Sequence, residues 1–261
     1  MPLLDIDGAT INFETLGDKG EWITLINGHT RSGSDFRMMA RILTESREFR
    51  VLMIDNRGSG KSQVTKPFTM IDMCDDIVRV WDHLGVSASN VLGISMGGFI
   101  SQGLAIKYPQ RVNKLVLVST APEESYIHPT GGAWSVEGDL VEQKMHAYFA
   151  PGFVDRNPVL FKTMISQIKI AITSGRFAKL SDLQRDAMRG ASWLAQLGKI
   201  SAKTMIIHGE MDRVVDLAGA EILREKIPNS TLEVIPGAGH LLLAENPKAL
   251  YRLASEFFLG R

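Results

Sequence analysis

A serine flanked by glycines follows an apolar run in the segment Val91-Leu92-Gly93-Ile94-Ser95-Met96-Gly97-Gly98. The spacing is Gly-x-Ser-x-Gly, and it lies where a strand-like run gives way to a helical pattern, which predicts a sharp strand-to-helix turn. Glycines two residues before and after the serine remove the side chains that would collide in such a turn. We therefore predict that Ser95 is a nucleophile. The alternative is a glycine-rich turn in which Ser95 only caps the following helix.

Short apolar runs rich in Val and Ile alternate with helical patterns on both sides of this turn. The alternation is typical of a mostly parallel sheet covered by helices. We expect strands at residues 22–26, 51–55, 90–94, 114–119, 203–208 and 231–235, and an edge hairpin that includes residues 9–13. We expect helices at residues 35–44, 70–84, 96–108, 217–226 and 247–258, the first capped by Ser34 and the second by Thr69.

The interval 121–201 breaks this alternation, because its patterns are helical and it contains no convincing strand. Eight aromatic residues lie in it: Tyr126, Trp134, Tyr148, Phe149, Phe153, Phe161, Phe177 and Trp193. They could form a small core of the interval or line a pocket. The interval has no low-complexity tract or linker composition. We predict a catalytic core at residues 1–120 and 202–261 and an inserted helical lid at 121–201.

A serine hydroxyl needs a base to take its proton and an acid to orient that base. His240 lies in a glycine-rich loop after the predicted strand 231–235, and Asp212 follows the predicted strand 203–208. Both are therefore candidates, in the chain order serine, acid, histidine. Asp216 and Glu210 are the alternative acids, but Asp216 more plausibly begins the next helix.

The other histidines suggest no further chemistry. We expect His83 to lie on a helix and His128 and His146 to lie in the lid, without a catalytic role. No two histidines have metal-ligand spacing with carboxylates, and no nucleotide-binding glycine motif occurs, so we expect neither a metal nor a cofactor.

A further glycine-rich turn reads Asp55-Asn56-Arg57-Gly58-Ser59-Gly60-Lys61-Ser62. Four motifs resemble those of α/β-hydrolase-fold proteins of the lid-bearing group: this turn, the Gly-x-Ser-x-Gly turn at Gly93–Gly97, and the loops 209–212 and 237–240. The resemblance covers nearly the whole chain. That group includes small esterases, enol-lactonases and cofactor-free haloperoxidases. The resemblance implies that Ser95 is the nucleophile, Asp212 the acid and His240 the base. It also implies that His208, at a strand end, is structural. Members that open epoxides or displace halide carry aspartate at the elbow, so we expect neither activity.

Two backbone amides are candidates for stabilising an oxyanion. The amide of Met96 begins the helix after the serine, where the partial positive charge of the helix favours an anion. Where the family usually has His-Gly-x, this chain has Asn27-Gly28-His29, so the resemblance implies the amide of His29 as the second donor. Arg31, on the same loop, is a candidate for attracting an anionic substrate. Arg57 is expected only to brace its own turn.

Composition excludes several classes of partner. The 261 residues carry 29 Lys and Arg against 29 Asp and Glu, without a basic stripe, which disfavours nucleic acid and anionic membranes. Cys74 is the only cysteine, so we expect no intramolecular disulfide and no cysteine-built zinc site. No apolar run approaches the roughly 18 residues of a membrane span. We expect a cytoplasmic protein, and the oligomeric state cannot be read.

These patterns together predict a serine hydrolase that cleaves a small carboxylic ester, lactone or thioester through an acyl-enzyme. A second hypothesis is a carbon–carbon bond hydrolase or perhydrolase, of the cofactor-free haloperoxidase kind, with the same three residues. A third is a ligand receptor that has kept the fold. The sequence does not identify the substrate, because the lid and loops that set specificity vary independently of the fold.

Overall fold

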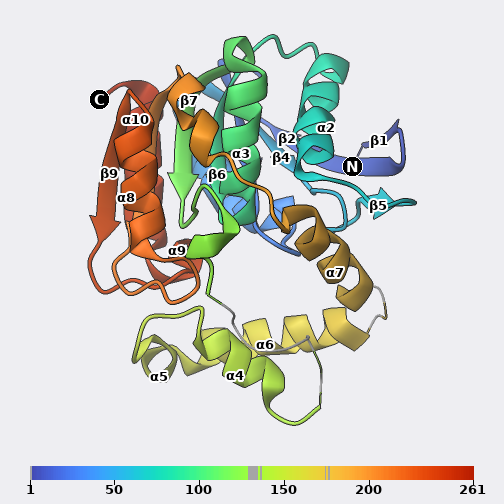
Figure 1. Ribbon diagram of the computed structural model, residues 1–261, viewed down its shortest axis with the longest axis vertical. Helices are drawn as coiled ribbons and strands as arrows, with labels where there is room; N and C mark the ends of the chain where they lie inside the picture. The colour runs from blue at the N-terminus through green and yellow to red at the C-terminus, as the bar shows by residue number, and fades with distance from the viewer. Residues whose placement is uncertain (1, 129–134, 136, 174, 176) are drawn as a thin grey trace.

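One sheet runs through the protein, whose computed structural model describes residues 2–128, 135, 137–173, 175 and 177–261. Within these residues the sheet has nine strands: eight follow the order β1-β2-β4-β3-β6-β7-β8-β9, and β5 pairs with β2 (Figure 1). The strands are β1 (Leu3–Ile6), β2 (Ala9–Leu16), β3 (Glu21–Ile26), β4 (Phe49–Ile54), β5 (Gln63–Val64), β6 (Ser89–Ile94), β7 (Val112–Val118), β8 (Lys203–Gly209) and β9 (Ser230–Ile235). Every predicted strand overlaps one of these, and β1 and β2 form the predicted edge hairpin.

The central strands bring their carboxyl ends to one edge of the sheet. Strands β4, β3, β6, β7, β8 and β9 are parallel, and β1 and β2 are antiparallel to their neighbours. The register pairs the final residues of adjacent strands: Ile26 with Gly93, Ile94 with Val118, and Gly209 with Ile235. The loops that follow β3, β6, β8 and β9 therefore begin side by side, which is where an α/β sheet builds its site.

Helices cover both faces of this sheet. They are α1 (Arg37–Glu45), α2 (Met70–His83), α3 (Met96–Lys107), α8 (Leu217–Lys226), α9 (Leu242–Glu245) and α10 (Pro247–Leu259). Helices α2, α3 and α8 pack on one face and α1 and α10 on the other, which confirms the predicted α/β fold. Among the described residues, no helix is both long and apolar enough to cross a membrane.

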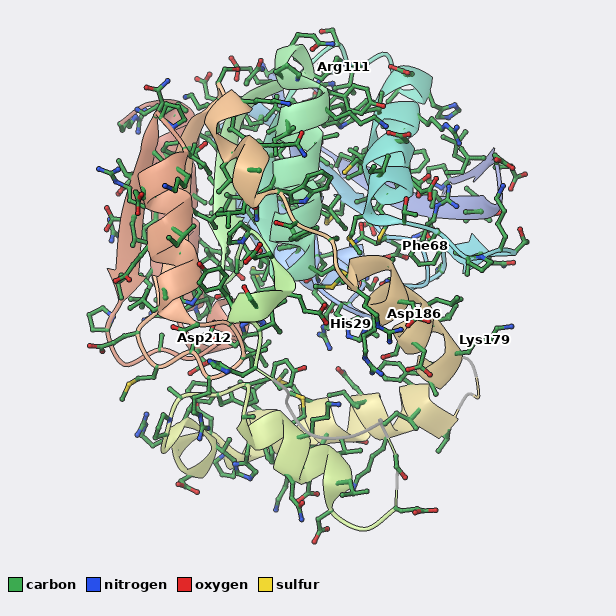
Figure 2. All side chains as sticks on the ribbon, in the orientation of Figure 1. His29, Phe68, Arg111, Lys179, Asp186 and Asp212 are labelled. Atoms are coloured by element: carbon green, nitrogen blue, oxygen red, sulfur yellow. The ribbon has the colours of Figure 1, made fainter. Side chains whose placement is uncertain are left out.

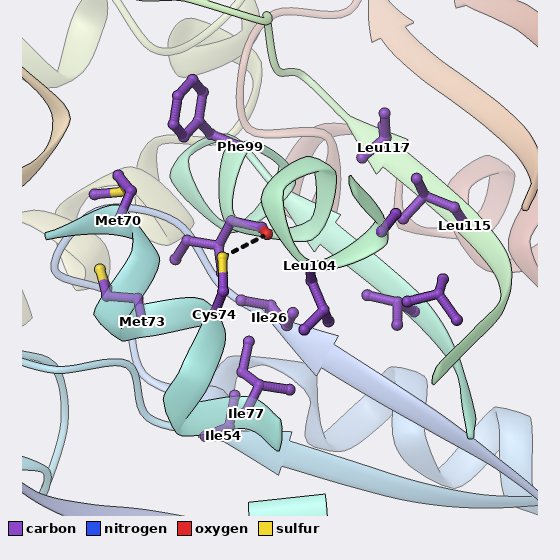
Figure 3. Packing of buried hydrophobic residues seen from close by; sticks show 14 of the residues in the cluster. Ile26, Ile54, Met70, Met73, Cys74, Ile77, Phe99, Leu104, Leu115 and Leu117 are labelled. Carbon is purple, nitrogen blue, oxygen red and sulfur yellow. Dashed lines mark hydrogen bonds between the residues drawn. The ribbon is translucent and has the colours of Figure 1, made fainter. Parts of the chain in front are cut away.

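The strand residues alternate between the two faces. On β7, Leu115 and Leu117 pack with α2 and α3 (Figure 3), whereas Val116 and Val118 pack toward α1 and α10. Because both faces are covered, such strands read as continuous apolar runs. Cys74 of α2 lies in the first cluster, where its thiol is 3.4 Å from the carbonyl oxygen of Ile100. Burial raises the pKa of this thiol to about 12, which makes it unreactive.

The chain between β7 and β8 is helical. It contains α4 (Leu140–His146), α5 (Phe153–Arg156), α6 (Pro158–Thr173) and α7 (Phe177–Met188), with short 3₁₀ helices η3 (Glu124–Tyr126) and η4 (Leu194–Lys199). Helices α4 to α7 form a helical layer beyond the carboxyl edge of the sheet, in which α7 leads back to the core (Figure 1). The layer has its own apolar cluster: Val141, Met145, Phe149, Phe161, Ile165 and Ile168.

The end of this interval packs with the core. Leu197 and Ile200 are fully buried in the cluster beneath α3, and the indole of Trp193 donates to the carbonyl oxygen of Phe99 at 3.0 Å. The interval's aromatic residues thus differ in role, since Phe149 and Phe161 belong to the helical layer. Trp134 lies outside the described residues. The division at residues 121 and 201 stays a prediction.

Two predicted helix caps had different outcomes. Thr69 caps α2 in a capping box with Asp72, as predicted. The cap at Ser34 is wrong, because Ser32 instead caps a 3₁₀ turn, η1 (Gly33–Phe36), and α1 begins only at Arg37. The reason is tertiary: the carboxylate of Asp55 accepts from the hydroxyl of Ser32 at 2.8 Å and from the amide of Gly33 at 2.7 Å.

Candidate active site

The turn between β6 and α3 holds Ser95 in a strained backbone conformation, with φ 55° and ψ −119°. A side chain at Gly93 would collide with the carbonyl oxygen of Gly97, and one at Gly97 would collide with that of Ile26. The carbonyl oxygen of Ser95 accepts a hydrogen bond from the hydroxyl of Thr120 at 2.8 Å. The glycines therefore permit the close turn, and surrounding contacts maintain it.

The loops after β8 and β9 bring Asp212 and His240 to this serine. His240 Nε2 lies 3.1 Å from Ser95 Oγ, and His240 Nδ1 lies 2.8 Å from Asp212 Oδ2. The other carboxylate oxygen accepts from the amides of Val214 and Val215 at 2.8 and 2.9 Å. An ionised carboxylate only accepts, so Nδ1 carries the proton and Nε2 can accept the proton of Ser95. The three predicted residues thus form one continuous chain of contacts.

Asp212 is fully buried yet remains an anion. Burial alone raises the pKa of a carboxyl group, but the hydrogen bonds that Asp212 accepts from the His240 ring and the amide of Val215 outweigh it. They hold the pKa of Asp212 below its ordinary value of 3.8. At neutral pH the carboxylate can therefore orient a histidine and balance its positive charge.

His208, expected to be structural, lies beside the same carboxylate. Its Nε2 lies 3.0 Å from the carbonyl oxygen of Val215 and 3.4 Å from Asp212 Oδ2. Burial lowers the pKa of His208, so the imidazole is neutral and its Nε2–H donates. This histidine secures the loop that carries the acid.

The two rival acids have other partners. Asp216 caps α8 by accepting from the amide of Ala218 at 3.0 Å. Glu210 accepts from the amide of Gly237 at 2.8 Å. Of these carboxylates, only that of Asp212 is bonded to the His240 ring.

The loop after β3 passes close beside Ser95. A Cβ on Gly28 would lie 3.3 Å from the Cβ of Ser95, so backbone rather than side chain faces the serine. Among the hydrogen bonds of the described residues, none uses the amide of His29 or of Met96 as donor. Both amides therefore remain available to an oxygen atom near Ser95, as an oxyanion hole requires.

Asn27, where the chain departs from the family pattern, braces this loop. Its side-chain oxygen accepts from the amide of Gly28 at 2.8 Å. Its nitrogen donates to the carbonyl oxygen of Ser32 at 2.9 Å and to Asp35 at 3.1 Å. The amide of Gly28 is thus occupied, which leaves the amide of His29 as the free donor of the pair.

The two arginines near the loop are both paired. Arg31 contacts Asp35 at 2.7 Å and is 40% exposed, so its charge is already balanced. Its assignment to substrate binding stays a prediction. Arg57 is buried, forms a two-point ion pair with Asp76 of α2, and donates to the carbonyl oxygen of Asp7. It therefore braces its turn, as expected.

Sequence reasoning missed the residues that join the helical layer to these loops. On one side, His29 and Thr30 contact Ser181 and Gln184 of α7 (Figure 2 labels His29 next to this helix). On the other side, Arg213 and Glu245 contact residues 146–150. Arg213 directly follows Asp212 in the sequence, which was a usable signal; Gln184 and Glu245 lie in no recognisable pattern.

The described residues contain no group of three or more His, Cys, Asp or Glu side chains placed to hold a metal ion.

This fold and site define a hydrolase. The family model for the alpha/beta hydrolase fold matches residues 21–164 and 135–247, and the chain belongs to that family.

Named relatives agree with this class. The enzyme 3-oxoadipate enol-lactonase 2 from Acinetobacter baylyi is 29% identical over 209 residues, which cover 76% of this chain and 74% of the relative. The enzyme 2-hydroxymuconate semialdehyde hydrolase from Pseudomonas putida is 26% identical over 270 residues, covering 93% and 89%. A solved alpha/beta hydrolase from a Medee basin deep-sea metagenome library has a TM-score of 0.90 at 19% identity, covering 100% of this chain and 98% of that one. This last likeness concerns the fold alone.

Proposed function

We propose that this protein is a serine hydrolase that cleaves a small carboxylic ester, lactone or thioester through an acyl-enzyme, without a cofactor. The observation that carries the proposal is the unbroken contact from Ser95 through His240 to the buried anion Asp212, beside two free amides. Such an arrangement suits acyl transfer, because the same base serves both halves of the reaction.

In the first half, Ser95 Oγ attacks the carbonyl carbon of the substrate while His240 Nε2 takes its proton. The carbonyl oxygen becomes an oxyanion that accepts hydrogen bonds from the amides of Met96 and His29. Met96 begins the 12-residue helix α3, whose end adds a partial positive charge. Asp212 stabilises the imidazolium that forms.

The tetrahedral intermediate then collapses. His240 gives its proton to the leaving oxygen or sulfur, and the acyl group stays on Ser95 as an ester. Water loses a proton to the same His240 Nε2 and attacks the acyl carbon. Return of that proton to Ser95 releases the carboxylic acid and restores the enzyme. Every step uses groups present in the chain.

The relatives support the substrate class. The name of the Acinetobacter baylyi relative specifies an enol-lactone, which is a cyclic carboxylic ester. The name of the Pseudomonas putida relative specifies a semialdehyde, which contains no ester bond. Carbon–carbon bond hydrolysis by the same three residues is therefore the second candidate function. Comparing initial rates on lactones with initial rates on vinylogous 1,5-diketones would distinguish ester hydrolysis from carbon–carbon bond hydrolysis.

Labelling and turnover test the proposal. A fluorophosphonate should label Ser95 in the folded protein, and p-nitrophenyl esters of graded acyl length should be turned over. Ser95→Ala should lose both, with kcat falling by about a millionfold. Ser101→Ala is the matched control, because Ser101 lies on the same helix but bonds only the carbonyl oxygen of Gly97. Absence of labelling together with absence of turnover for esters, lactones and thioesters would contradict the proposal.

A further inference from the structure

Gln184 of the helical layer joins two loops of the core through one buried amide group. Its Oε1 accepts from the backbone amide of Thr30 at 2.7 Å. Its Nε2 donates to the carbonyl oxygen of Arg57 at 2.6 Å and to the hydroxyl of Ser59 at 2.9 Å. The side chain is completely buried. A buried amide with both ends satisfied fixes the relative position of the groups that it bonds.

Thr30 is the residue whose backbone most needs support. It has a φ of +61°, a region that a β-branched residue rarely adopts. Such strain persists only where surrounding contacts hold it, and the bond from its amide to Gln184 is one of two that do so. The other runs from the hydroxyl of Thr30 to the carbonyl oxygen of His29 at 2.6 Å.

His29 is held by the same helix. Its Nε2 lies 2.9 Å from the carbonyl oxygen of Ser181, one turn before Gln184 on α7. Burial lowers the pKa of His29, so the imidazole is neutral and donates through Nε2–H. Helix α7 therefore fixes the side chain of His29 and the peptide that follows it, while the amide of His29 itself stays free beside Ser95.

We propose that Gln184 is a positioning residue for the oxyanion hole: by holding Thr30, it aims the free amide of His29 at the oxygen that becomes negative on attack by Ser95. The inference rests on the proposed function, since it presumes that the amide of His29 is an oxyanion donor. Gln184 acts through Thr30 and does not touch the reacting atoms.

Displacing a hydrogen-bond donor weakens the binding of the transition state more than the binding of the substrate. Removal of one oxyanion donor lowers kcat by roughly a hundred- to a thousandfold in other hydrolases. Displacement without removal should therefore lower kcat by about ten- to a hundredfold and change KM by less than about twofold. The affinity for a trifluoromethyl ketone, whose hemiketal places an oxyanion in the hole, should fall in parallel with kcat/KM.

The test uses Gln184→Met, which keeps the volume and removes all three hydrogen bonds. We would measure kcat and KM on a p-nitrophenyl ester, the inhibition constant of the trifluoromethyl ketone, and thermal unfolding. Ser59→Ala is the matched control, because it removes a hydrogen bond from the other end of the same amide and leaves the bond to Thr30. Gln143→Met, at an exposed glutamine of α4, controls for the substitution itself. Both controls should keep kcat and ketone affinity within about twofold.

Because burial favours the neutral form of a carboxyl group, Gln184→Glu keeps an acceptor for the amide of Thr30 and a donor for the carbonyl oxygen of Arg57, so it should retain at least about threefold more kcat than Gln184→Met. If the methionine variant does not fold, Gln184→Ala, which also removes all three hydrogen bonds, carries the test through its ketone affinity, which should fall by about ten- to a hundredfold. Unchanged kcat and ketone affinity in folded Gln184→Met would overturn the inference. Equal losses in Gln184→Met and Ser59→Ala would also overturn it, because they indicate a purely structural role. A wild-type protein that is neither labelled nor active would instead contradict the proposed function.

Discussion

The helical layer contacts the candidate site at two places, and the two contacts differ in chemistry. At the loop of His29, the contact is made by Gln184, a neutral and fully buried amide. At the loops of Asp212 and His240, charged side chains bond the backbone of residues 146–150. The amide of Gln184 should therefore be insensitive to pH, whereas the second contact, which includes the carboxylate of Glu245, should respond to it. The first borders the amide of His29, the proposed oxyanion donor, and the second borders His240, the proposed base.

At the charged contact, four backbone groups of residues 146–150 are bonded, three by charged side chains and one by the backbone of His240. Arg213 donates to the carbonyl oxygens of His146 and Phe149 at 2.6 and 3.0 Å. The amide of His240 donates to the carbonyl oxygen of Tyr148 at 3.0 Å. The carboxylate of Glu245 accepts from the amide of Ala150, on this segment, at 3.0 Å, and from the amide of Gly239 at 3.1 Å. The backbone of the base is therefore bonded to the helical layer directly.

The largest effect should come from removing the acid beside this contact. Asp212→Asn should lower kcat by about ten-thousandfold, because the amide favours the wrong tautomer of His240. Asp216→Asn makes the same change four residues later, where asparagine caps α8 as well as aspartate does, and it should leave kcat unchanged. Steady-state kinetics on an aryl ester measures both. Similar losses in the two variants would refute the assignment of Asp212.

The next effect concerns the charged contact itself. Arg213→Ala leaves the carbonyl oxygens of His146 and Phe149 without this donor, which should lower the free energy of unfolding by about 1–3 kcal/mol. Arg252→Ala, which breaks an exposed pair with Glu256, should lower it by less than about 1 kcal/mol. Urea unfolding measures both. A cost for Arg213 no larger than that for Arg252 would show that the contact contributes little.

The pH dependence should distinguish the charged contact from the neutral one. Burial, and to a smaller extent the charge of Asp212, raises the pKa of Glu245 above its ordinary value of 4.5. Between 4.5 and the raised pKa, the folded state holds the proton more tightly than the unfolded state, so Glu245 makes the protein less stable as pH rises through this window. The effect of Asp212 on stability has the opposite dependence on pH. Because its pKa is lowered in the folded state, Asp212 stabilises the protein above pH 3.8, and this stabilisation is lost as the pH falls below 3.8.

Glu245→Gln removes the titration at the charged contact. The difference in unfolding free energy between this variant and the wild type should therefore change with pH above 4.5, by at most about 1.4 kcal/mol per pH unit. The difference between Gln184→Met and the wild type should stay constant over the same range. Urea unfolding from pH 4 to 8 tests both statements. A constant difference for Glu245→Gln would show that Glu245 does not titrate in the folded state with a raised pKa.

The smallest effect should come from Arg31, which lies on the oxyanion loop outside both contacts. Its pair with Asp35 is partly exposed, so Arg31→Ala should cost about 0–1 kcal/mol. Because the pair balances its charge, the preference between neutral and carboxylate-bearing esters should change by less than about twofold. Competition between two such esters measures this preference. A tenfold loss for the carboxylate-bearing ester alone would assign Arg31 to substrate binding.

The fold was predictable because its information is local. Strands buried on both faces read as apolar runs, and capping residues such as Thr69 stand next to the helices that they begin. The start of α1 was not predictable, because Asp55, some twenty residues later in the chain, binds Ser32 and Gly33 and forms a 3₁₀ turn there.

The same distinction applies to the candidate site. Ser95, Asp212 and His240 each lie in a short glycine-containing pattern after a strand, and the parallel register brings those patterns together. Gln184 has no such pattern, since its partners are 125 to 154 residues away along the chain. Contacts between the helical layer and the core depend on the tertiary arrangement, which no window of sequence contains.

Trapping the acyl-enzyme tests the central claim most directly. The protein would be mixed rapidly with p-nitrophenyl acetate, quenched in acid within the first turnover, digested and analysed by mass spectrometry. The account predicts one acetyl group on the peptide that contains Ser95, absent from Ser95→Ala and accumulating in Asp212→Asn if deacylation becomes limiting. Turnover of the ester with no acetyl group on Ser95 at any time, or with the group on another residue, would contradict it.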